Sequence, residues 1–308
     1  MKTLEKSNNK KLIVLTGTTC SGKTLTALNL SDLVKTEIIS ADSMLVYNKF
    51  DIGTAKPSKE ILNRTKHHLI DIVEPDEHFD AWRYMQLGRE VIYNSKLRNL
   101  IVAGGTQLYI KSLIEGLSLN IPKDDGIREN ILKEVELKGA LHVYNKLQEL
   151  DPQGAASINP NDKQRIIRYL EINYITGLKV SEVFHSRSSE RIKNAGHIKV
   201  GLSMEKYHLN KMIDERVDRM IARGLIDEVE YLRSTYSEDI KPLRGIGYKE
   251  ICLYLGGNLK IEEAIALIKI RTKQFAKRQR TWLRKDKEII WFDQVEDLIR
   301  DCIDYATN

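Results

Sequence analysis

The feature that most constrains the fold is a glycine-bounded motif near the start of the chain. Residues 17–24 read Gly-Thr-Thr-Cys-Ser-Gly-Lys-Thr and satisfy the pattern G-x-x-x-x-G-K-[ST]. The apolar, β-rich run at residues 12–15 predicts a strand before the motif, and residues 25–33 have the helical character expected after it. Because a strand and a helix flank the motif, a phosphate-binding loop is a better interpretation than a chance match in a coil.

Such a loop binds phosphate for simple physical reasons. Its glycines let the backbone curl so that successive N–H groups point at phosphate oxygens, and the helix that follows adds the positive end of its dipole. Lys23 adds a positive charge, and the Thr24 hydroxyl can hold Mg²⁺. The motif therefore predicts that a diphosphate or a triphosphate binds here, without showing that the ligand is a nucleotide.

The rest of the chain alternates between strands and helices. Residues 37–40 and 100–103 predict two more strands, and residues 200–202 and 289–292 could add strands to the same sheet. Strands that alternate with helical stretches favour parallel pairing through crossover helices. We therefore expect an α/β fold, with a P-loop NTPase-like parallel sheet flanked by helices.

The middle of the chain is mainly helical instead. Residues 127–150 predict one helix, because their apolar positions recur at helical spacing. Residues 163–176 predict another, with Asn161 or Asp162 as its N-cap and Gly177 just past its end.

This arrangement predicts two structural parts. We expect a helical insertion subdomain at residues 121–198, between the two pieces of a catalytic core at residues 1–120 and 199–308. Residues 209–232 in the second piece are strongly amphipathic, with their apolar side chains on one helical face.

Asp42 follows the predicted strand at residues 37–40 directly. In open α/β sheets, ligands bind beyond the carboxyl ends of the strands, so Asp42 is expected to face the same crevice as the phosphate loop. A carboxylate there can accept a proton from an attacking nucleophile. The alternative is that Asp42 or Ser43 only caps the next turn, and position alone does not decide between the two.

The basic residues are unevenly distributed. The formal net charge is only +6, yet residues 269–287 contain nine basic residues and a single acidic one, Asp286. The nine are Lys269, Arg271, Lys273, Lys277, Arg278, Arg280, Arg284, Lys285 and Lys287. Solvated helix faces normally mix charges of both signs, so this stretch predicts contact with a nucleic-acid backbone. Phe275 and Trp282 could stack on bases or pack inward.

Other features exclude whole classes of protein. The three cysteines, Cys20, Cys252 and Cys302, are too far apart for a disulfide framework or a structural zinc site and fit a reducing compartment. The first apolar run is too short for a signal peptide or a membrane span, so we expect a cytoplasmic protein without membrane contact. The pair at residues 67–68, two histidines, lacks a third metal ligand at suitable spacing and is interpreted as structural or substrate-lining.

A series of short motifs follows the phosphate loop, up to about Arg284. They lie at residues 42–47, 51–57, 67–72, 104–109, 161–165, 245–248 and 277–282. Together and in this order they resemble the signature of the tRNA dimethylallyltransferase family, also called tRNA isopentenyltransferases, in its short bacterial form. The chain departs from the family at Thr18 and Lys163, where proline is usual, and at Cys20, where a small residue is commoner.

The resemblance implies a substrate for the phosphate loop. In the family the loop holds the diphosphate of dimethylallyl diphosphate rather than ATP, with Mg²⁺ shared between the diphosphate and the residue that corresponds to Thr24. The residues of this chain that would bind the diphosphate are Gly17, Thr19, Cys20, Ser21, Gly22, Lys23 and Thr24.

The resemblance also implies three catalytic roles. Arg216 would neutralise the charge that develops on the departing diphosphate. Without the resemblance, Arg216 would be interpreted as an exposed helix residue in a surface ion pair. Asp42 would bind the N6 amino group of adenine and accept its proton, and Thr106 would line the channel in which the extruded base meets the prenyl donor.

The expected acceptor is the adenosine on the 3′ side of the anticodon in tRNA, bound through the anticodon stem-loop by a monomeric enzyme. The resemblance places tRNA contacts at Asp42, Ser43, Met44, Leu45, Thr106, Arg128, Gln164, Arg165, Arg168, Arg244, Gly247, Tyr248, Lys249, Lys277, Arg278, Arg280 and Arg284.

Three other functions are compatible with parts of the sequence. A small-molecule or nucleotide kinase would use the same phosphate loop, but it needs no basic stretch. An enzyme that prenylates free adenine nucleotides also needs no surface for an anticodon arm. A non-catalytic RNA-binding module would not need Lys23, Thr24 and Asp42, all of which are present.

Overall fold

The computed structural model describes residues 10–117, 121–185 and 191–308, which fall into two compact units. The first consists of Met1–Leu113 and Lys193–Asn308, and the second of Ile114–Ile192. The predicted limits of the insertion, 121–198, are therefore displaced at both ends. The Ile192 N–H donates to the Ile114 carbonyl oxygen at 2.9 Å and so pairs the two ends of the second unit, whereas residues 195–198 belong to a strand of the sheet.

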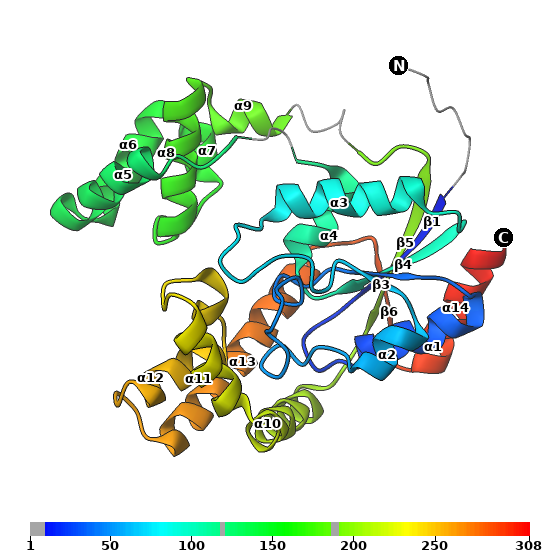
Figure 1. Ribbon diagram of the computed structural model, residues 1–308. Helices are drawn as coiled ribbons and strands as arrows, with labels where there is room; N and C mark the ends of the chain where they lie inside the picture. Colours follow the sequence, from blue (N-terminus) through cyan, green and yellow to red (C-terminus); the bar gives the residue numbers. More distant parts are fainter. Residues whose placement is uncertain (1–9, 118–120, 186–190) are drawn as a thin grey trace. The chain divides into compact units, whose positions relative to one another are not determined.

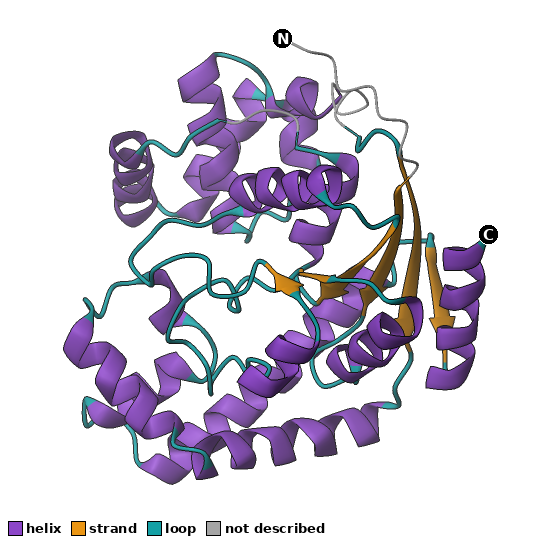
Figure 2. Ribbon diagram, turned by 45° about the vertical axis from the view of Figure 1, so that its right-hand side comes forward, coloured by secondary structure: helices purple, strands orange, loops and turns teal. Residues whose placement is uncertain are grey.

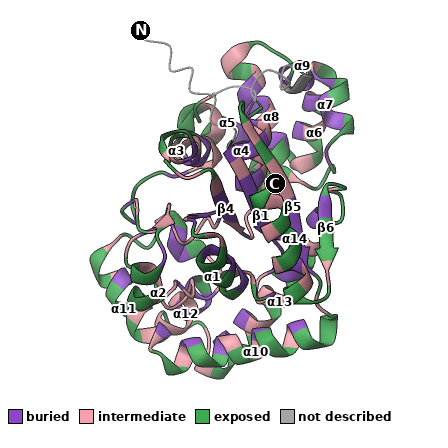
Figure 3. Ribbon diagram, turned by 90° about the vertical axis from the view of Figure 1, so that its right-hand side faces the viewer, coloured by how far each residue is buried: buried purple, intermediate pink, exposed green. Residues whose placement is uncertain are grey.

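The first unit is built on a six-stranded parallel sheet with the order β3-β2-β4-β1-β5-β6 (Figure 1). The strands are β1 (Lys10–Thr16), β2 (Ile38–Ser40), β3 (His67–His68), β4 (Asn99–Gly104), β5 (Ala195–Leu202) and β6 (Ile289–Phe292). Central β1 is buried along almost its whole length, between β4 and β5 (Figure 3). The parallel sheet and each of the strands predicted from the sequence are confirmed.

The register of the sheet brings three functional segments to one edge. Thr16 pairs with Gly104 and Ser40 pairs with Ala103, so the chain leaves β1, β2 and β4 at the same level. The segment after β2 passes so close to β4 that a Cβ atom at Gly104 would lie 2.1 Å from the Ala41 carbonyl oxygen. This contact explains why glycine is needed at that position.

Helices cover both faces of the sheet (Figure 2). On one face, α1 (Lys23–Val34) and the C-terminal helix α14 (Val295–Thr307) form a core with the strands. On the other face lies α3 (Ala81–Asn94), and α4 (Gln107–Glu115) follows β4. The short helix α2 (Lys59–Arg64) precedes β3.

A group of helices follows β5. They are α10 (Lys206–Ala222), α11 (Leu225–Thr235), the 3₁₀ helix η2 (Lys241–Arg244), α12 (Tyr248–Leu255) and α13 (Ile261–Leu283). The amphipathic stretch at 209–232, which reads as continuous in the sequence, is divided between α10 and α11. Gly224 between them has φ 93°, a left-handed conformation that ends the first helix and that glycine adopts without strain. The apolar face nevertheless continues on both helices.

The second unit is a helical bundle. Its helices are α5 (Asp125–Lys138), α6 (Ala140–Leu150), α7 (Pro152–Ala156), α8 (Lys163–Thr176) and α9 (Val180–His185). The single helix predicted at 127–150 is wrong, because Gly139 at φ 85° separates α5 from α6. The predicted ends of α8 are confirmed: Asp162 caps its N-terminus, and Gly177 has φ 68° after its last turn.

Over the residues that the structure describes, no helix has both the length and the apolar character needed to cross a lipid bilayer.

Candidate active site

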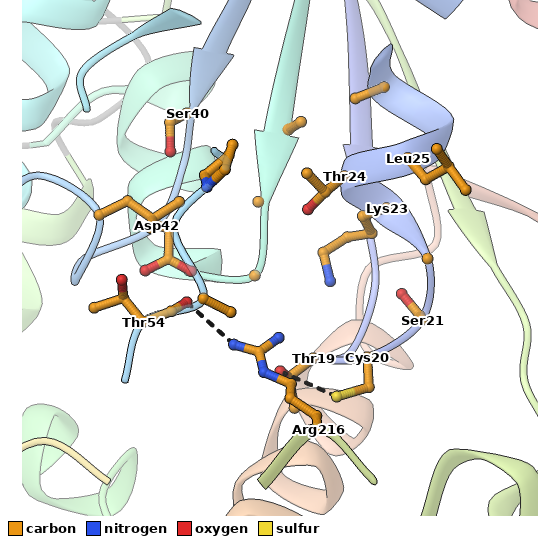
Figure 4. A pocket seen from close by; sticks show the side chains of 18 of the residues that line it. Thr19, Cys20, Ser21, Lys23, Thr24, Leu25, Ser40, Asp42, Thr54 and Arg216 are labelled. Carbon is orange, nitrogen blue, oxygen red and sulfur yellow. Dashed lines mark hydrogen bonds between the residues drawn. The ribbon is translucent and has the colours of Figure 1, made fainter. Parts of the chain in front are cut away.

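The first unit contains a cavity of about 500 Å³ at the carboxyl edge of the sheet (Figure 4). The phosphate loop, the segment after β2, the segment at 52–57, helix α10 and helix α13 all contribute to its wall. Residues predicted from the sequence that line the cavity are Thr19, Cys20, Ser21, Gly22, Lys23, Thr24, Asp42, Leu45 and Arg216. Positions that are more than 170 residues apart in the sequence are thus brought to one site.

The phosphate loop is folded as the motif requires. Gly22 caps α1 with φ 88°, and the Lys23 ammonium donates to the Thr18 carbonyl oxygen at 2.5 Å. The Ser21 hydroxyl is buried and has no hydrogen-bond partner among the described residues. A buried polar group of this kind normally has a partner, so its place in the cavity wall suits a hydrogen bond to an oxygen of a ligand.

The charges in the cavity influence one another. Burial lowers the pKa of Lys23 to about 8, Asp42 opposes this shift, and Arg216 adds to it. The ammonium therefore lies among groups of both signs, and no described carboxylate pairs with it directly. A bound polyanion would stabilise its charged form.

Asp42 both caps a turn and lines the cavity, so its position is compatible with both roles that the sequence left open. Its Oδ1 accepts a hydrogen bond from the Met44 N–H at 2.8 Å, as a residue that caps a turn does. The carboxylate also lines the cavity, on the side opposite Lys23 (Figure 4). Within the described part of the chain, Oδ2 makes no hydrogen bond, so this oxygen can accept one from a substrate amino group.

Arg216 enters the cavity from α10. Its guanidinium donates to the Thr54 carbonyl oxygen at 3.1 Å, which holds the side chain between the segment that carries Thr54 and the phosphate loop (Figure 4). The 51–54 segment is fixed in turn by Glu228 of α11, whose carboxylate accepts from the N–H groups of residues 51, 52 and 53 at 2.7–3.1 Å and from the Tyr248 hydroxyl at 2.7 Å. The sequence did not identify Glu228, since nothing in its spacing distinguishes it from other helix carboxylates.

Two of the residues predicted to be catalytic or to bind the diphosphate lie outside the cavity wall. Gly17 contacts the phosphate loop itself, since a Cβ atom at this position would lie 2.8 Å from the Ser21 hydroxyl. Thr106, expected to line a channel, accepts a hydrogen bond from the Ser43 N–H at 3.0 Å instead. Thr106 therefore holds the segment that carries Asp42.

The donor atoms at the phosphate loop are compatible with Mg²⁺, which prefers oxygen ligands together with substrate phosphates. Thr24 lies in the first turn of α1 and lines the cavity, near the unpartnered Ser21 hydroxyl. Thr24 is thus the residue that would hold the ion.

The two histidines of the 67–68 pair have different surroundings. His67 lines the cavity with its Nδ1 2.7 Å from the Thr65 carbonyl oxygen, and burial lowers its pKa. The Nε2 of His68 lies 2.7 Å from a carboxylate oxygen of Glu37, the residue that precedes β2. No cluster of three or more potential metal-ligating side chains occurs in the described ranges.

The basic stretch at 269–287 divides into two parts. In the first part, Lys269, Arg271 and Lys273 form ion pairs with Asp218, Glu250 and Asp214 of neighbouring helices. We call the second part the free cations, because none of its side chains forms an ion pair with any residue described. They are Lys277, Arg278, Arg280, Arg284, Lys285 and Lys287.

Two aromatic residues accompany the free cations. Trp282 is 39% exposed, so it does not pack in the core, and it lines a shallow groove with Lys277 and Arg278. Phe275 lines the cavity, and the Arg278 guanidinium lies 5.9 Å from its ring centroid.

The other predicted tRNA contacts are less uniform. In the second unit, Arg128 and Arg168 both pair with buried Glu171, whereas Gln164 is exposed and Arg165 pairs with Asp162 at 3.4 Å.

The segment around η2 requires a correction. Arg244 and Lys249 are exposed, but the Tyr248 side chain is fully buried, with its ring centroid 4.7 Å from that of Phe50. Its hydroxyl is bound to Glu228. The side chain of Tyr248 is therefore part of the core, and the tRNA contact predicted for it is not supported by this structure.

Comparison with known proteins identifies the family of this chain. Residues 45–286 match the model of the family described as IPP transferase. The tRNA dimethylallyltransferase of Geobacter sulfurreducens is 42% identical over 286 residues, and that of Desulforudis audaxviator is 41% identical over 288; each alignment covers 92% of both chains.

Solved structures are similar as well. The tRNA isopentenylpyrophosphate transferase of Bacillus halodurans is 34% identical, with a TM-score of 0.71 over 97% of each chain. A eukaryotic dimethylallyltransferase described as acting on tRNA is 29% identical, with a TM-score of 0.76 over 92% of this chain and 73% of the other. With a family model that spans most of the sequence and relatives above 40% identity, this chain belongs to the tRNA dimethylallyltransferase family.

Proposed function

We propose that this protein transfers the dimethylallyl group of dimethylallyl diphosphate to N6 of the adenosine on the 3′ side of the anticodon in tRNA. The observation that carries the proposal is a single cavity in which a phosphate loop, a carboxylate and an arginine meet, on a unit that also bears the free cations. The relatives that share most of this sequence are named for the same transfer to tRNA.

The reaction makes one bond and breaks another. The lone pair of the adenine N6 attacks the allylic carbon, and the bond from that carbon to the diphosphate oxygen breaks, so that diphosphate leaves with the electron pair. Asp42 accepts the proton from N6 through its available Oδ2. Because the exocyclic amine is a weak nucleophile, holding it in line with the allylic carbon contributes much of the rate.

The leaving group is stabilised on the opposite side of the cavity. Lys23 and Arg216 place two positive charges where negative charge develops, and the backbone N–H groups at the start of α1 add to them. Mg²⁺ held through Thr24 would supply further charge neutralisation for the diphosphate. The buried Ser21 hydroxyl would donate to a phosphate oxygen.

The tRNA is proposed to bind through its anticodon stem-loop on the free cations. An exposed group of unpaired basic residues suits a phosphate backbone. The target base must leave its stack to bring N6 to Asp42. We further propose that the protein acts as a monomer in the cytoplasm, where its three free cysteines are compatible with reducing conditions.

Two alternatives are less well supported. A kinase would share the phosphate loop, but phosphoryl transfer does not account for the free cations. An enzyme that prenylates free adenine nucleotides would share the cavity, but it likewise needs no surface for RNA.

The transfer itself is the direct test of the proposal. Purified protein is incubated with dimethylallyl diphosphate, Mg²⁺ and unmodified tRNA, and the nucleosides are analysed by mass spectrometry. A C5H8 gain on the adenosine next to the anticodon is the expected result. A gain only on free adenine nucleotides, or ATP consumption without prenylation, would contradict it.

The role of Asp42 is tested by Asp42→Asn. Asparagine keeps an oxygen for the Met44 N–H but cannot take up a proton, so we expect single-turnover transfer to fall by about 10²–10⁴-fold while tRNA affinity is retained. Asp76→Asn, a change of the same type at an exposed position outside the cavity, serves as the control. Transfer by Asp42→Asn close to that of the control would exclude Asp42 as the base.

A further inference from the structure

Gln279 lies in the middle of the basic stretch, yet its side chain turns away from solvent. It is 7% exposed and lines the cavity, whereas Lys277 and Arg278 beside it are exposed. Its Oε1 accepts a hydrogen bond from the Thr19 N–H at 2.8 Å, and its Nε2 donates to the Gly105 carbonyl oxygen at 3.0 Å.

These two bonds join separate parts of the site. Thr19 belongs to the phosphate loop after β1, and Gly105 belongs to the loop after β4, next to Thr106. A side-chain amide provides both the acceptor and the donor that this bridge needs, which neither a hydrocarbon nor an ammonium could do. The surrounding structure also makes room for it, since a Cβ atom at Gly105 would lie 2.5 Å from the Gln279 Nε2.

We propose that Gln279 is a positioning residue for the diphosphate loop and not a tRNA contact. By fixing the Thr19 amide, it holds the start of the loop so that the N–H groups after it stay directed into the cavity. Helix α13 then has two functions. Gln279, on the face toward the cavity, supports binding of the prenyl donor, and the free cations, on the exposed face and beyond the helix, bind RNA. The proposal rests on the proposed function, because it assumes that the cavity binds the donor's diphosphate.

The first test separates the two substrates. Gln279→Met keeps the length of the side chain and removes both hydrogen bonds, while Arg278→Ala removes the neighbouring free cation. Binding of inorganic diphosphate with Mg²⁺ is measured by calorimetry, KM for dimethylallyl diphosphate and for tRNA by steady-state assay, and folding by thermal unfolding.

For Gln279→Met we expect diphosphate affinity to fall about tenfold, because the loop amide loses its acceptor. KM for dimethylallyl diphosphate should rise accordingly, with KM for tRNA unchanged. Arg278→Ala should raise KM for tRNA and leave both the diphosphate affinity and KM for dimethylallyl diphosphate unchanged. A Gln279→Met variant that binds diphosphate normally but has a raised KM for tRNA would overturn the proposal.

A double-mutant cycle tests the bridge itself. Gly105 does not have a positive φ, so alanine is allowed by the backbone there, and its methyl group would displace the Gln279 amide. Gly105→Ala alone should therefore weaken diphosphate binding by about as much as Gln279→Ala. The double variant should bind no more weakly than Gln279→Ala, because the shorter side chain leaves space for the new methyl group.

The outcomes also distinguish this proposal from the proposed function. If the wild-type protein binds diphosphate and the effects of Gly105→Ala and Gln279→Ala simply add, the bridge is wrong while the donor site stands. If the wild-type protein transfers no prenyl group and binds no diphosphate, the donor site is wrong, and the role of Gln279 is overturned with it.

Discussion

Two groups of cations in this protein form no ion pair with any carboxylate that the structure describes, and they differ in where they lie. Lys23 and Arg216 are in the cavity, where each donates to a backbone carbonyl oxygen. The free cations lie along the end of α13 and beyond it, most of them exposed to solvent. By contrast, the three cations at the start of the basic stretch each form an ion pair with a carboxylate of a neighbouring helix.

The cations of the two groups are expected to affect ligand binding differently, because their surroundings differ. In the cavity, each charge is held beside the bound ligand and acts strongly on it, and burial lowers the pKa of Lys23, so the charge of this residue responds to pH. On α13 the charges are hydrated and screened, so each contributes modestly and responds to salt. The two groups should therefore respond differently to substitution, pH and ionic strength.

The largest expected effect comes from Lys23→Met. Removing the charge from the cavity should lower single-turnover transfer by about 10²–10³-fold, because an oriented charge in a poorly solvated site stabilises the leaving group far more than one in water. The affinity for tRNA, measured by filter binding, should not change.

The matched change on the other group is Lys277→Met. It removes the same charge from an exposed position, so we expect a small loss of tRNA affinity and a normal rate of transfer at saturating tRNA. Equal loss of transfer in the two variants would mean that the distinction between the cavity and α13 is wrong.

The second expected effect is a pH dependence confined to the cavity. Because burial lowers the pKa of Lys23 to about 8, the free protein loses this charge as pH rises through 8, and diphosphate affinity should fall by up to about tenfold per pH unit above that value. The unfolded chain holds the same proton up to about pH 10.5, so this group makes the free energy of unfolding increase with pH between about 8 and 10.5. Calorimetric titration with diphosphate between pH 7 and 9.5 measures the binding effect.

Lys23→Arg is the control for this pH dependence, since arginine stays charged throughout the range. Its diphosphate affinity should be nearly independent of pH between 7 and 9.5. If the wild-type protein is equally insensitive, Lys23 does not titrate in the cavity.

The third effect concerns salt. Arg278→Ala together with Arg280→Ala should weaken tRNA binding about tenfold, and the dependence of log K on log salt should become shallower by about 0.7–0.9 for each phosphate that the variant no longer neutralises. Binding is measured between 50 and 300 mM salt. An unchanged slope would place the RNA-binding surface elsewhere.

Much of the architecture could be predicted from local patterns. Short apolar runs identified the strands, and a left-handed glycine after α8 marked its end, because these signals depend only on neighbouring residues. The breaks at Gly139 and Gly224 were missed, since the apolar periodicity continues across each glycine while the helix axis changes.

Site residues that belong to short sequence motifs could be predicted, whereas those defined by distant contacts could not. Lys23 follows from a motif. Asp42 was a candidate because of its place after a strand, but only the resemblance gave it a catalytic role, and Arg216 was identified by resemblance alone. Glu228 and Gln279 were missed as contributors, because the loop segments that they hold lie more than 170 residues away in the sequence and only the folded chain brings them together.

The smallest expected effect tests the boundary within the basic stretch. Lys269→Ala and Lys273→Ala remove cations that already have carboxylate partners, on Asp218 and Asp214 of α10. Partly exposed pairs of this kind contribute about 0–1 kcal/mol each, so urea unfolding should show a slight loss of stability. Affinity for tRNA should stay within about twofold of the wild-type value and its salt slope should not change, because these charges are engaged within the protein. The contrary result would be a loss of tRNA affinity as large as that caused by the substitutions at Arg278 and Arg280. In that case cations that form ion pairs within the protein would also bind RNA, and the RNA-binding surface would not be limited to the free cations.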